Sequence, residues 1–395
     1  MITVSEALEQ VTALFSPLPI ELVPLRQAAG RILGREVAAT RDQPPFAASS
    51  MDGYGVLDKD AKPGAKFDII GESAAGSGFS GTVGSGQAVR IFTGAPIPGG
   101  VDRVVIQEDV TRAENVITIG EHLETSRFIR PKGDDFCVGE AMSTPRKLTP
   151  ADVALLASMN IAEVPVRRRP IVALIATGDE LVMPGENPGP DQIIASNNFG
   201  LAALLEAEGA EVRLLPIAKD TPQSLTLALK LCGGADLIVT IGGASVGDHD
   251  IVRPVAQELG LVPTFYKIAM RPGKPLMAGK LGDVPMIGLP GNPVSSMVCG
   301  HVFLRPALNK MHGLGGQPLP RELARLGKDM KANGPREHYM RASLAVEYSQ
   351  LTAHPFDRQD SALLTVLSKA NALLVRPEGD PARKAGEMVE VIRYS

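Results

Sequence analysis

The spacing of apolar positions changes along the chain, and it predicts where helices and strands lie. Near the N-terminus, Thr3-Val-Ser-Glu6 is typical of a helix-capping box, and apolar residues then recur at helical spacing as far as Leu14. A second amphipathic stretch follows around residues 25–33. Another helix is predicted over residues 147–162, because Thr149 suits an N-cap and Pro150 suits the first helical position.

Between residues 44 and 140, the pattern indicates a small all-β unit in which short β-branched runs alternate with glycine-rich turns. The predicted strands there are residues 67–70, 87–92, 103–107, 116–119 and 127–129. Short strands return near the C-terminus, at residues 339–346, 372–375 and 387–392. The last part of the chain is therefore predicted to be a second small β domain.

Strands and helices alternate between these two β regions. Ile171–Ala176 is a nearly continuous apolar run, as expected of a strand that is buried on both faces. Strands are also predicted at residues 211–217, 237–241 and 286–289, and helices at residues 197–208, 222–231, 252–259 and 293–308. The alternation predicts an open, mostly parallel α/β sheet.

Composition narrows the class of protein. The 395 residues suffice for two to four domains. Hydrophobic residues make up 44% of the chain, which argues against disorder, and the 41 glycines and 32 prolines indicate many turns. A net charge of −4 and the absence of Trp argue against a nucleic-acid partner.

The three cysteines and the apolar runs bear on the compartment. Cys137, Cys232 and Cys299 form no CxxC pair, so a disulfide framework or zinc site is disfavoured, and a reducing cytoplasm fits. All three are predicted to be ordinary core residues. Residues 284–304 form an uncharged run, but its prolines favour a strand, loop and helix over a membrane span. No secretory signal is recognised.

Three glycine-containing turns follow predicted strands, where open α/β sheets bind ligands. Ala176-Thr-Gly-Asp-Glu180 places two acids together, which suits a metal or a hydroxyl-rich ligand, although a solvated turn is the better interpretation of this motif alone. Thr240-Ile-Gly-Gly-Ala-Ser-Val-Gly-Asp248 suits a phosphate, and Leu289-Pro-Gly-Asn-Pro293 places a helix N-terminus beside an anion. For each of these two motifs, a plain turn without a ligand is about as strongly favoured as an anion-binding turn.

Three cations lie between the second and third turns. Arg271-Pro-Gly-Lys-Pro275 follows Lys267 by four residues. An exposed loop would explain these cations, but their coincidence with two anion-friendly turns favours a site for an anionic ligand.

Taken together, these segments resemble the MoeA family of molybdopterin molybdenumtransferases, which includes the gephyrin E domain. Eight short motifs match in order along almost the whole chain, so a chance match is improbable. They are Pro44-Pro-Phe46, Ser50-Met-Asp-Gly-Tyr54, Arg90-Ile-Phe-Thr-Gly-Ala-Pro96, Gln107-Glu-Asp109, Ala176-Thr-Gly-Asp-Glu-Leu181, Gly242-Gly-Ala-Ser-Val-Gly247, Arg271-Pro-Gly-Lys-Pro275 and Gly288-Leu-Pro-Gly-Asn-Pro293.

The resemblance implies a multi-domain fold of α/β and β parts. Residues 1–43 and 141–168 are expected to form a discontinuous helical linker domain, with residues 44–140 inserted as a β domain. Residues 169–316 are expected to form a molybdopterin-binding, doubly wound α/β domain, and residues 317–395 a small β-barrel-like domain. Homodimers are implied, with the active cleft between the α/β domain of one subunit and the inserted β domain of the other.

The implied reaction inserts molybdate into adenylated molybdopterin and releases AMP, assisted by Mg²⁺. The resemblance further implies a cytoplasmic enzyme without a nucleic-acid or membrane partner. It also implies transient contact with molybdopterin adenylyltransferase and molybdoenzyme chaperones. Two alternatives are a molybdopterin adenylyltransferase, which is expected to be a single small α/β domain, and a scaffold similar to gephyrin, which is expected to need a further domain and a long linker.

The resemblance also implies roles for individual residues. Catalytic residues are expected to be Asp52, Thr93, Glu180, Asp220, Lys267 and Lys274, and metal ligands to be Glu180, Asp220 and Asp250. Ligand-binding positions are expected to be Thr177, Gly178, Asp179, Ser196, Gly242, Gly243, Ser245, Gly247, Asp250, Arg271, Pro290, Gly291, Asn292, Pro293, Arg341 and Ser361. Three departures affect fine contacts: Ala195 stands where relatives often carry Asp, Arg271 replaces a frequent Lys, and Ala47-Ala48 replaces a more polar pair.

Overall fold

The computed structural model describes residues 1–243 and 251–394 of the chain. They form two compact units. The first unit contains Met1–Glu21 and Arg167–Ser395, and the second contains Leu22–Val166.

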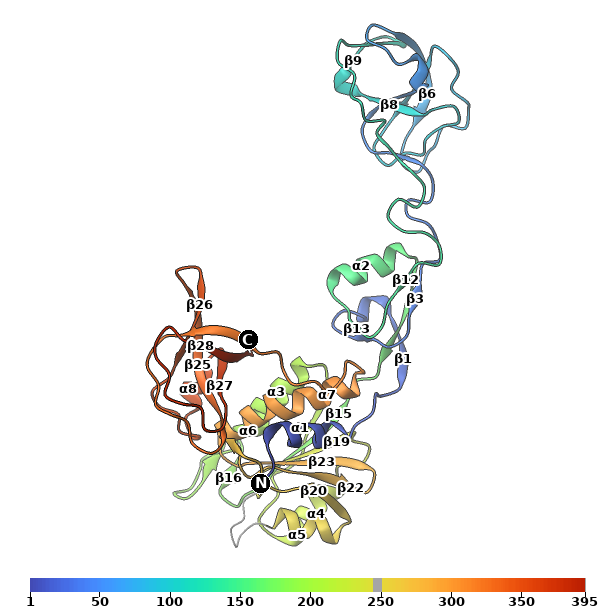
Figure 1. Ribbon diagram of the computed structural model, residues 1–395. Coiled ribbons are helices and arrows are strands. Elements are labelled where there is room, and N and C mark those ends of the chain that lie inside the picture. Colours follow the sequence, from blue (N-terminus) through green and yellow to red (C-terminus); the bar gives the residue numbers. More distant parts are fainter. Residues whose placement is uncertain (244–250, 395) are drawn as a thin grey trace. The chain divides into compact units, whose positions relative to one another are not determined.

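The α/β part of the first unit is built on a six-stranded sheet (Figure 1). Four of its strands are parallel, and an antiparallel strand separates them from the last one. In spatial order the strands are β18 (Glu211–Leu214), β15 (Ile171–Ala176), β19 (Leu237–Ile241), β23 (Val284–Leu289), β22 (Met277–Leu281) and β20 (Leu261–Phe265). The central strands β15 and β19 are almost entirely buried, as their largely apolar sequence predicts.

Helices cover both faces of this sheet, which confirms the doubly wound fold (Figure 1). One face carries α1 (Val4–Thr12), α3 (Asn197–Ala207) and the continuous helical segment of α6 (Pro293–Cys299), η4 (Gly300–Leu304) and α7 (Arg305–Met311). The other face carries α4 (Pro222–Lys230) and α5 (Val252–Glu258). Local signals start several of these helices. The capping box of Thr3 with Glu6 is present, and the Thr221 side chain accepts from the Ser224 N–H.

The strand order determines where this sheet opens. The chain passes from β15 to the edge strand β18 and then returns to β19 on the other side of β15. The order therefore reverses between β15 and β19. In open α/β sheets, such a reversal leaves a crevice at the carboxyl ends of the two strands, where ligands bind.

The C-terminal part of the first unit is a closed five-stranded barrel. Its strands are β24 (Glu322–Leu326), β25 (Glu337–Glu347), β26 (Gln350–Pro355), β27 (Ala372–Arg376) and β28 (Met388–Arg393). The long strand β25 pairs with both β26 and β27, which closes the barrel. The short strand β21 (Met270–Arg271) pairs with β25 and so ties the α/β part to the barrel. Helix α8 (Leu364–Lys369) packs against β25.

The second unit contains a six-stranded sheet and a smaller sheet-and-helix cluster. The larger sheet has the order β8 (Arg103–Ile106), β5 (Gly53–Val56), β7 (Gln87–Ile91), β6 (Lys66–Ser73), β10 (Val116–Ile119) and β9 (Val110–Ala113), which confirms the predicted all-β texture. Short strands β4 (Ala48–Ser49) and β11 (Ile129–Arg130) pair beside it. The smaller cluster contains β1 (Ile20–Pro24), β14 (Glu163–Arg167), β2 (Ile32–Leu33), β13 (Arg146–Lys147), β3 (Val37–Ala38), β12 (Ala141–Met142) and α2 (Pro150–Ser158).

The amphipathic stretch at residues 25–33 is not a helix beyond one turn. It consists of the 3-10 turn η1 (Leu25–Gln27) and the strand β2. Gly30 has a φ of 74°, which interrupts a right-handed helix, and its N–H donates to the Leu148 carbonyl. Pairing with sequence-distant β13 and β14 then fixes β2, so tertiary contacts override the local pattern.

The N-terminal helix belongs to a different unit from the one that the sequence predicted. Helix α1 packs into the core of the first unit, although the expected domain division assigned residues 1–43 to the linker. The other proposed domain boundaries stay predictions.

Cys232 and Cys299 are buried as predicted, whereas Cys137 is exposed and so is not a core residue. Within the residues that the structure describes, no helix has the length and hydropathy needed to cross a membrane.

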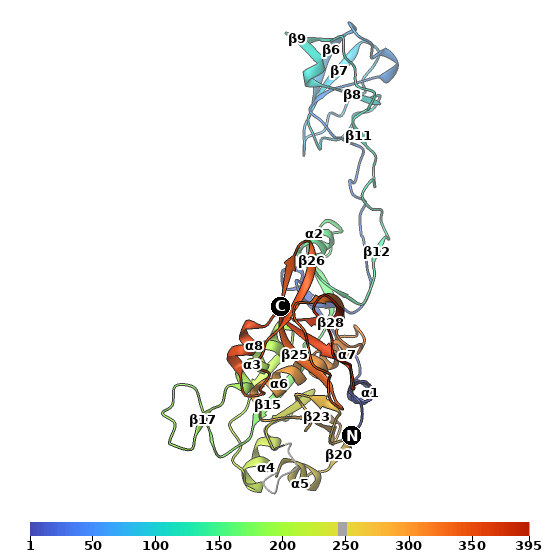
Figure 2. The same ribbon diagram turned by 60° about the vertical axis from the view of Figure 1, so that its left-hand side comes forward.

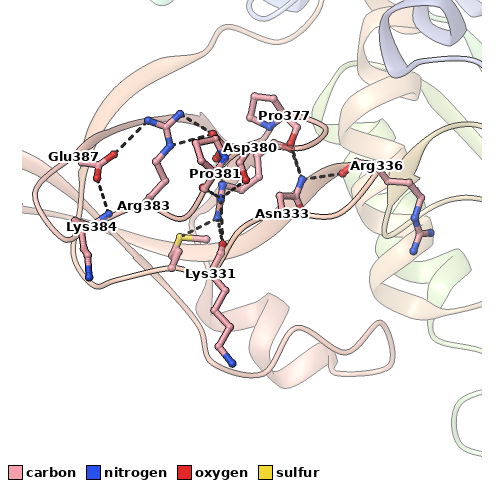
Figure 3. A network of polar contacts seen from close by, with 11 residues as sticks. Lys331, Asn333, Arg336, Pro377, Asp380, Pro381, Arg383, Lys384 and Glu387 are labelled. Atoms are coloured by element: carbon pink, nitrogen blue, oxygen red, sulfur yellow. Dashed lines mark hydrogen bonds and ion pairs between the residues drawn. The ribbon is translucent and has the colours of Figure 1, made fainter.

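A buried ion network holds together the loops at one end of the barrel (Figure 3). The Asp380 carboxylate accepts from the Arg376 and Arg383 guanidiniums, and Arg376 also donates to the Pro381 carbonyl at 2.7 Å. Burial alone would raise the pKa of Asp380, but the hydrogen bonds from Arg383 and Arg376 outweigh it and lower the pKa. Both Asp380 and Arg376 are almost inaccessible to solvent.

We predict that Asp380→Asn destabilises the protein by about 3 kcal/mol or more, because it leaves the Arg376 charge buried without a counter-ion. Since the folded-state pKa of Asp380 lies below its ordinary value of 3.8, the stabilisation is complete above that pH and is lost as the pH falls further. Calorimetric unfolding of the full chain at neutral and acidic pH measures both effects. Asp329→Asn, at an exposed ion pair with Lys384, is the matched control and should leave the melting temperature nearly unchanged.

Candidate active site

A cavity of about 570 Å³ opens at the carboxyl ends of the parallel strands, at the point where the strand order reverses. Half of the residues expected at the site line it. They are Thr177, Gly178, Glu180, Ser196, Asp220, Gly242, Gly243, Pro290, Gly291, Asn292 and Pro293. The three glycine-containing turns that follow β15, β19 and β23 thus contribute to one cavity.

Backbone contacts bring the turns after β15, β18 and β19 together. The Thr177 N–H donates to the Ile241 carbonyl at 3.0 Å, and the Gly178 N–H donates to the Ala218 carbonyl at 3.1 Å. Gly242 and Gly243 have φ values of 94° and 60°, a conformation that favours glycine. A Cβ on Gly242 would lie 2.8 Å from the Thr177 carbonyl oxygen, and one on Gly243 would lie 2.3 Å from a Val252 methyl group. Side chains at these two positions would therefore force the turns apart.

The acidic side of the cavity contains Glu180 and Asp220. Asp179 lies beside them but not in the cavity lining. Its Oδ1 accepts from the Asp220 N–H at 3.1 Å, and Asp220 Oδ2 accepts from the Asp179 N–H at 3.4 Å. The two aspartates thus bind each other's backbone across the gap between the turns after β15 and β18.

The opposite wall is formed by the start of α3 and the turn after β23. Asn197 Nδ2 donates to the Gly291 carbonyl at 2.7 Å and so connects these two segments. Ala195, where a carboxylate was noted as frequent in relatives, is buried and contributes only a methyl group to the lining.

An apolar rim of Leu181, Ile193 and Ile194 completes this side of the cavity. It belongs to the short strands β16 (Leu181–Val182) and β17 (Ile193–Ile194), on a loop that extends away from the helices (Figure 2). Sequence reasoning did not identify the rim, because residues 181–194 show no strand or helix periodicity. It also missed Asn197, which directly follows the predicted Ser196 in the sequence.

The three predicted cations Lys267, Arg271 and Lys274 lie near this cavity but outside its lining, whereas Pro275 of the same loop lines it. Within the part of the chain that the structure describes, none of the three forms an ion pair with a carboxylate. The loop therefore carries positive charge that no described side chain neutralises.

Arg341 on β25 is the most unusual of the predicted ligand-binding residues. Its side chain is fully buried, and Nη2 donates to the Asp360 carbonyl at 3.0 Å. Nε and Nη1 have no hydrogen-bond partner among the described residues. Burial lowers the pKa of the Arg341 guanidinium, and the Arg271 charge lowers it further. A buried guanidinium with two unsatisfied nitrogens and no carboxylate partner is suited to an external anion.

Ser361 connects Arg341 to the cavity. The carbonyl of Ser361 accepts from the Val294 N–H at 2.9 Å, in the first turn of α6, and the next residue, Ala362, lines the cavity. The loop that contains Ala362 therefore forms part of the cavity wall, whereas Arg341 and Ser361 lie outside the lining, and their roles stay predictions. The Val294 N–H is satisfied by protein and is not free for a ligand.

His338 is a buried neighbour of these cations that sequence reasoning missed. Its side chain is almost fully buried, and Nε2 has no partner among the described residues. Burial, followed by the charges of Arg271 and Arg341, lowers the pKa of His338 to about 3, so the imidazole is neutral at physiological pH. His338 therefore adds no charge of its own to this group of arginines.

Asp52 and Thr93 belong to the second unit. The Thr93 N–H and hydroxyl both donate to Asp52 Oδ1, at 2.7 and 2.8 Å. The hydrogen bond from the Thr93 backbone, the one from its hydroxyl and the nearby Arg90 charge lower the pKa of Asp52. The carboxylate is ionised, and Oδ2 has no hydrogen bond to any described residue.

The predicted Ser245, Gly247 and Asp250 lie outside the described residues.

Comparison with known proteins agrees with these segments. Residues 2–160 match the profile described as MoeA N-terminal region (domain I and II), residues 173–310 a probable molybdopterin binding domain, and residues 323–394 the MoeA C-terminal region (domain IV). The chain is 35% identical to the molybdopterin molybdenumtransferase of Nostoc sp., over 97% of this chain and 91% of that one. It is 34% identical to the enzyme of the same name from Haemophilus influenzae, over 98% and 96%.

A solved structure agrees over the whole length of the chain. The crystal structure of a molybdopterin biosynthesis MoeA protein from Pyrococcus horikosii has a TM-score of 0.85 and 30% sequence identity, and the match covers 100% of this chain and 99% of that one. The succession of an inserted β region, a doubly wound α/β domain and a closed barrel is thus shared from end to end. On these matches, and on the turns that meet at the strand reversal, the chain belongs to the MoeA family.

Proposed function

We infer that this protein is a molybdopterin molybdenumtransferase, which inserts molybdate into adenylated molybdopterin in molybdenum cofactor biosynthesis. Relatives of this name match nearly the full chain at 34–35% identity. The structural observation that carries the proposal is the cavity at the strand reversal, with carboxylates on one side and a buried, unsatisfied guanidinium behind the other. Such a site suits a ligand that combines phosphate groups with a second anion.

The cations are proposed to hold the anionic groups. The Arg341 guanidinium is proposed to donate from Nε and Nη1 to two oxygens of molybdate. Neither nitrogen has a partner among the described residues, but both are buried behind the cavity lining, so the side chain must become accessible when the ligand binds. Arg271, Lys267 and Lys274 carry charge that no described carboxylate neutralises, and they would attract the phosphates. Lys274 directly precedes Pro275, which lines the cavity, and this supports the role of that lysine.

The acidic side of the cavity fits a divalent cation such as Mg²⁺. Mg²⁺ is usually held by one or two carboxylates together with substrate phosphates, and Glu180 and Asp220 supply two hard oxygen donors in the lining. Among the described residues, no group of three His, Cys, Asp or Glu side chains could hold a metal alone, so the substrate would have to complete the coordination. When bound, the cation would polarise the phosphoanhydride, and AMP would leave as the molybdenum is inserted.

The assembly of the site is proposed to involve a homodimer. Asp52 and Thr93 are presented by a unit separate from the cavity, and the family resemblance implies that they reach the cleft of a second subunit. Asp52 is held ionised by Thr93 with one oxygen open, so it can accept a hydrogen bond from substrate. A cytoplasmic location and transient contacts with molybdopterin adenylyltransferase and molybdoenzyme chaperones are part of the same proposal.

We predict that Glu180→Gln lowers the turnover of AMP release by at least about tenfold without changing the melting temperature. The substitution removes the negative charge of the carboxylate that is proposed to bind the cation, but it keeps the volume of the side chain. The assay uses adenylated molybdopterin, molybdate and Mg²⁺, and follows AMP by chromatography. Glu186→Gln is the control, because Glu186 lies outside the cavity lining and accepts from the Met183 N–H at 2.8 Å. Equal activity of the two variants would contradict the role of Glu180.

We predict that Arg341→Met raises the KM for molybdate by about 10-fold to 100-fold, the equivalent of one or two lost charge-assisted hydrogen bonds. No carboxylate is orphaned by this change, because Arg341 contacts only carbonyl and amide oxygens among the described residues. Arg325→Met, at an exposed arginine of the same barrel, should leave the KM unchanged. A normal molybdate KM in Arg341→Met would exclude Arg341 from oxyanion binding.

We predict that two inactive variants, Asp52→Asn and Glu180→Gln, regain activity when their subunits are mixed. If each cleft takes Asp52 from one subunit and Glu180 from the other, hybrid dimers contain one intact cleft. Random exchange of subunits should then restore about one quarter of wild-type AMP release. Light scattering establishes the dimer. Mixed subunits that exchange but stay inactive would show that both residues must come from the same chain.

A further inference from the structure

Asp179 and Asp220 form a reciprocal pair beside the cavity. Each carboxylate accepts the backbone N–H of the other residue, at 3.1 Å for the Asp220 N–H and 3.4 Å for the Asp179 N–H. Only Asp220 lines the cavity. Asp220 therefore faces the cavity, whereas Asp179 is connected to the cavity only through Asp220.

The surrounding contacts hold the two turns at a fixed separation. The Gly178 N–H donates to the Ala218 carbonyl at 3.1 Å, and the Lys219 N–H donates to Ser224 Oγ at 2.9 Å. Lys219 Nζ also reaches the Asp179 carbonyl at 3.5 Å. Asp220 directly precedes Thr221, the N-cap of α4. It lies in a short loop, and the partner of the Asp220 N–H helps to fix the direction of the backbone there.

We propose that Asp179 is a positioning residue: it acts through the Asp220 N–H to orient the Asp220 carboxylate toward the cavity, and it is not itself a ligand of cation or substrate. The engagement of Asp220 Oδ2 by the Asp179 N–H leaves Oδ1 for the cavity. What the structure requires of residue 179 is an acceptor oxygen at the Oδ1 position, not a negative charge. This inference rests on the proposed function only in assuming that Asp220 holds a cation.

The distinction is chemical and can be tested with matched substitutions. Asp179→Asn keeps the acceptor oxygen and removes the charge, whereas Asp179→Ala removes both. A positioning residue tolerates the first change and not the second. A cation ligand is damaged by both, since the neutral amide oxygen is a weaker partner for a hard cation.

The experiment measures Mn²⁺ binding to the full-length protein by electron paramagnetic resonance in the presence of AMP, whose phosphate oxygens can complete the coordination, together with kcat and KM for AMP release. We expect the Mn²⁺ dissociation constant of Asp179→Asn to stay within about twofold of wild type, and that of Asp179→Ala to rise by about three- to tenfold, as for one lost hydrogen bond. Asp220→Asn should weaken Mn²⁺ binding by at least tenfold. Circular dichroism melting of every variant checks that the fold is retained.

A double-mutant cycle gives the decisive result. If Asp179 acts only through Asp220, adding Asp179→Ala to Asp220→Asn should change Mn²⁺ binding little further. Additive effects, equal losses in Asp179→Asn and Asp179→Ala, or wild-type binding in Asp179→Ala would each overturn the inference while leaving the proposed function intact. The expected Mn²⁺ pattern in a protein that releases no AMP would instead contradict the proposed function and support the positioning role.

Discussion

The architecture of the cavity depends on how closely the turn after β15 approaches the end of β19. The Thr177 N–H donates to the carbonyl of Ile241, the last residue of β19. Gly242, which follows Ile241, donates its own N–H to the Leu289 carbonyl of β23. Three strand ends are thus linked in series by backbone hydrogen bonds. A Cβ on Gly242 would sit 2.8 Å from the Thr177 oxygen, so any other residue would break the first link. The lining glycines and Thr177 are positioned directly by these turns.

Charge is distributed around the cavity in a way that differs from the rest of the barrel. Arg376 is neutralised by Asp380, and Arg321 is paired with Glu337 and Glu390. Arg341 is just as deeply buried as Arg376, but among the described residues its guanidinium donates only to the uncharged Asp360 carbonyl. Burying an unpaired guanidinium disfavours folding, and a stability-driven sequence would neutralise it. Its persistence without a counter-ion is consistent with an anion that arrives from outside, as the proposed reaction requires.

Local sequence signals predicted most elements and the main turns of the site. The capping residues Thr3, Thr149 and Thr221 act within one helical turn, so their sequence context is sufficient. Long-range contacts were the source of the misses. The amphipathic stretch at residues 25–33 ends in β2, whose partners lie more than 100 residues away. At Cys137 the preceding Phe136 is buried in the core, whereas Cys137 itself is exposed. The reciprocal bonds of Asp179 and Asp220 likewise join turns that are separated by one helix and three strands, which no spacing rule connects.

The barrel changes what the α/β cavity can do. The doubly wound sheet alone supplies the strand-end turns, the two acids and the glycines, which suit a phosphate-bearing ligand and a cation. Closure of β25 onto β27 holds Arg341, and the Ser361 carbonyl binds the first turn of α6, which brings the Ala362 backbone into the wall. What the barrel adds next to this cavity is therefore a buried arginine whose Nε and Nη1 have no partner among the described residues. In the proposed function, the turns of the α/β part hold the phosphates and Arg341 binds the additional oxyanion. This division of tasks favours the insertion of molybdate over adenylation as the chemistry of this chain.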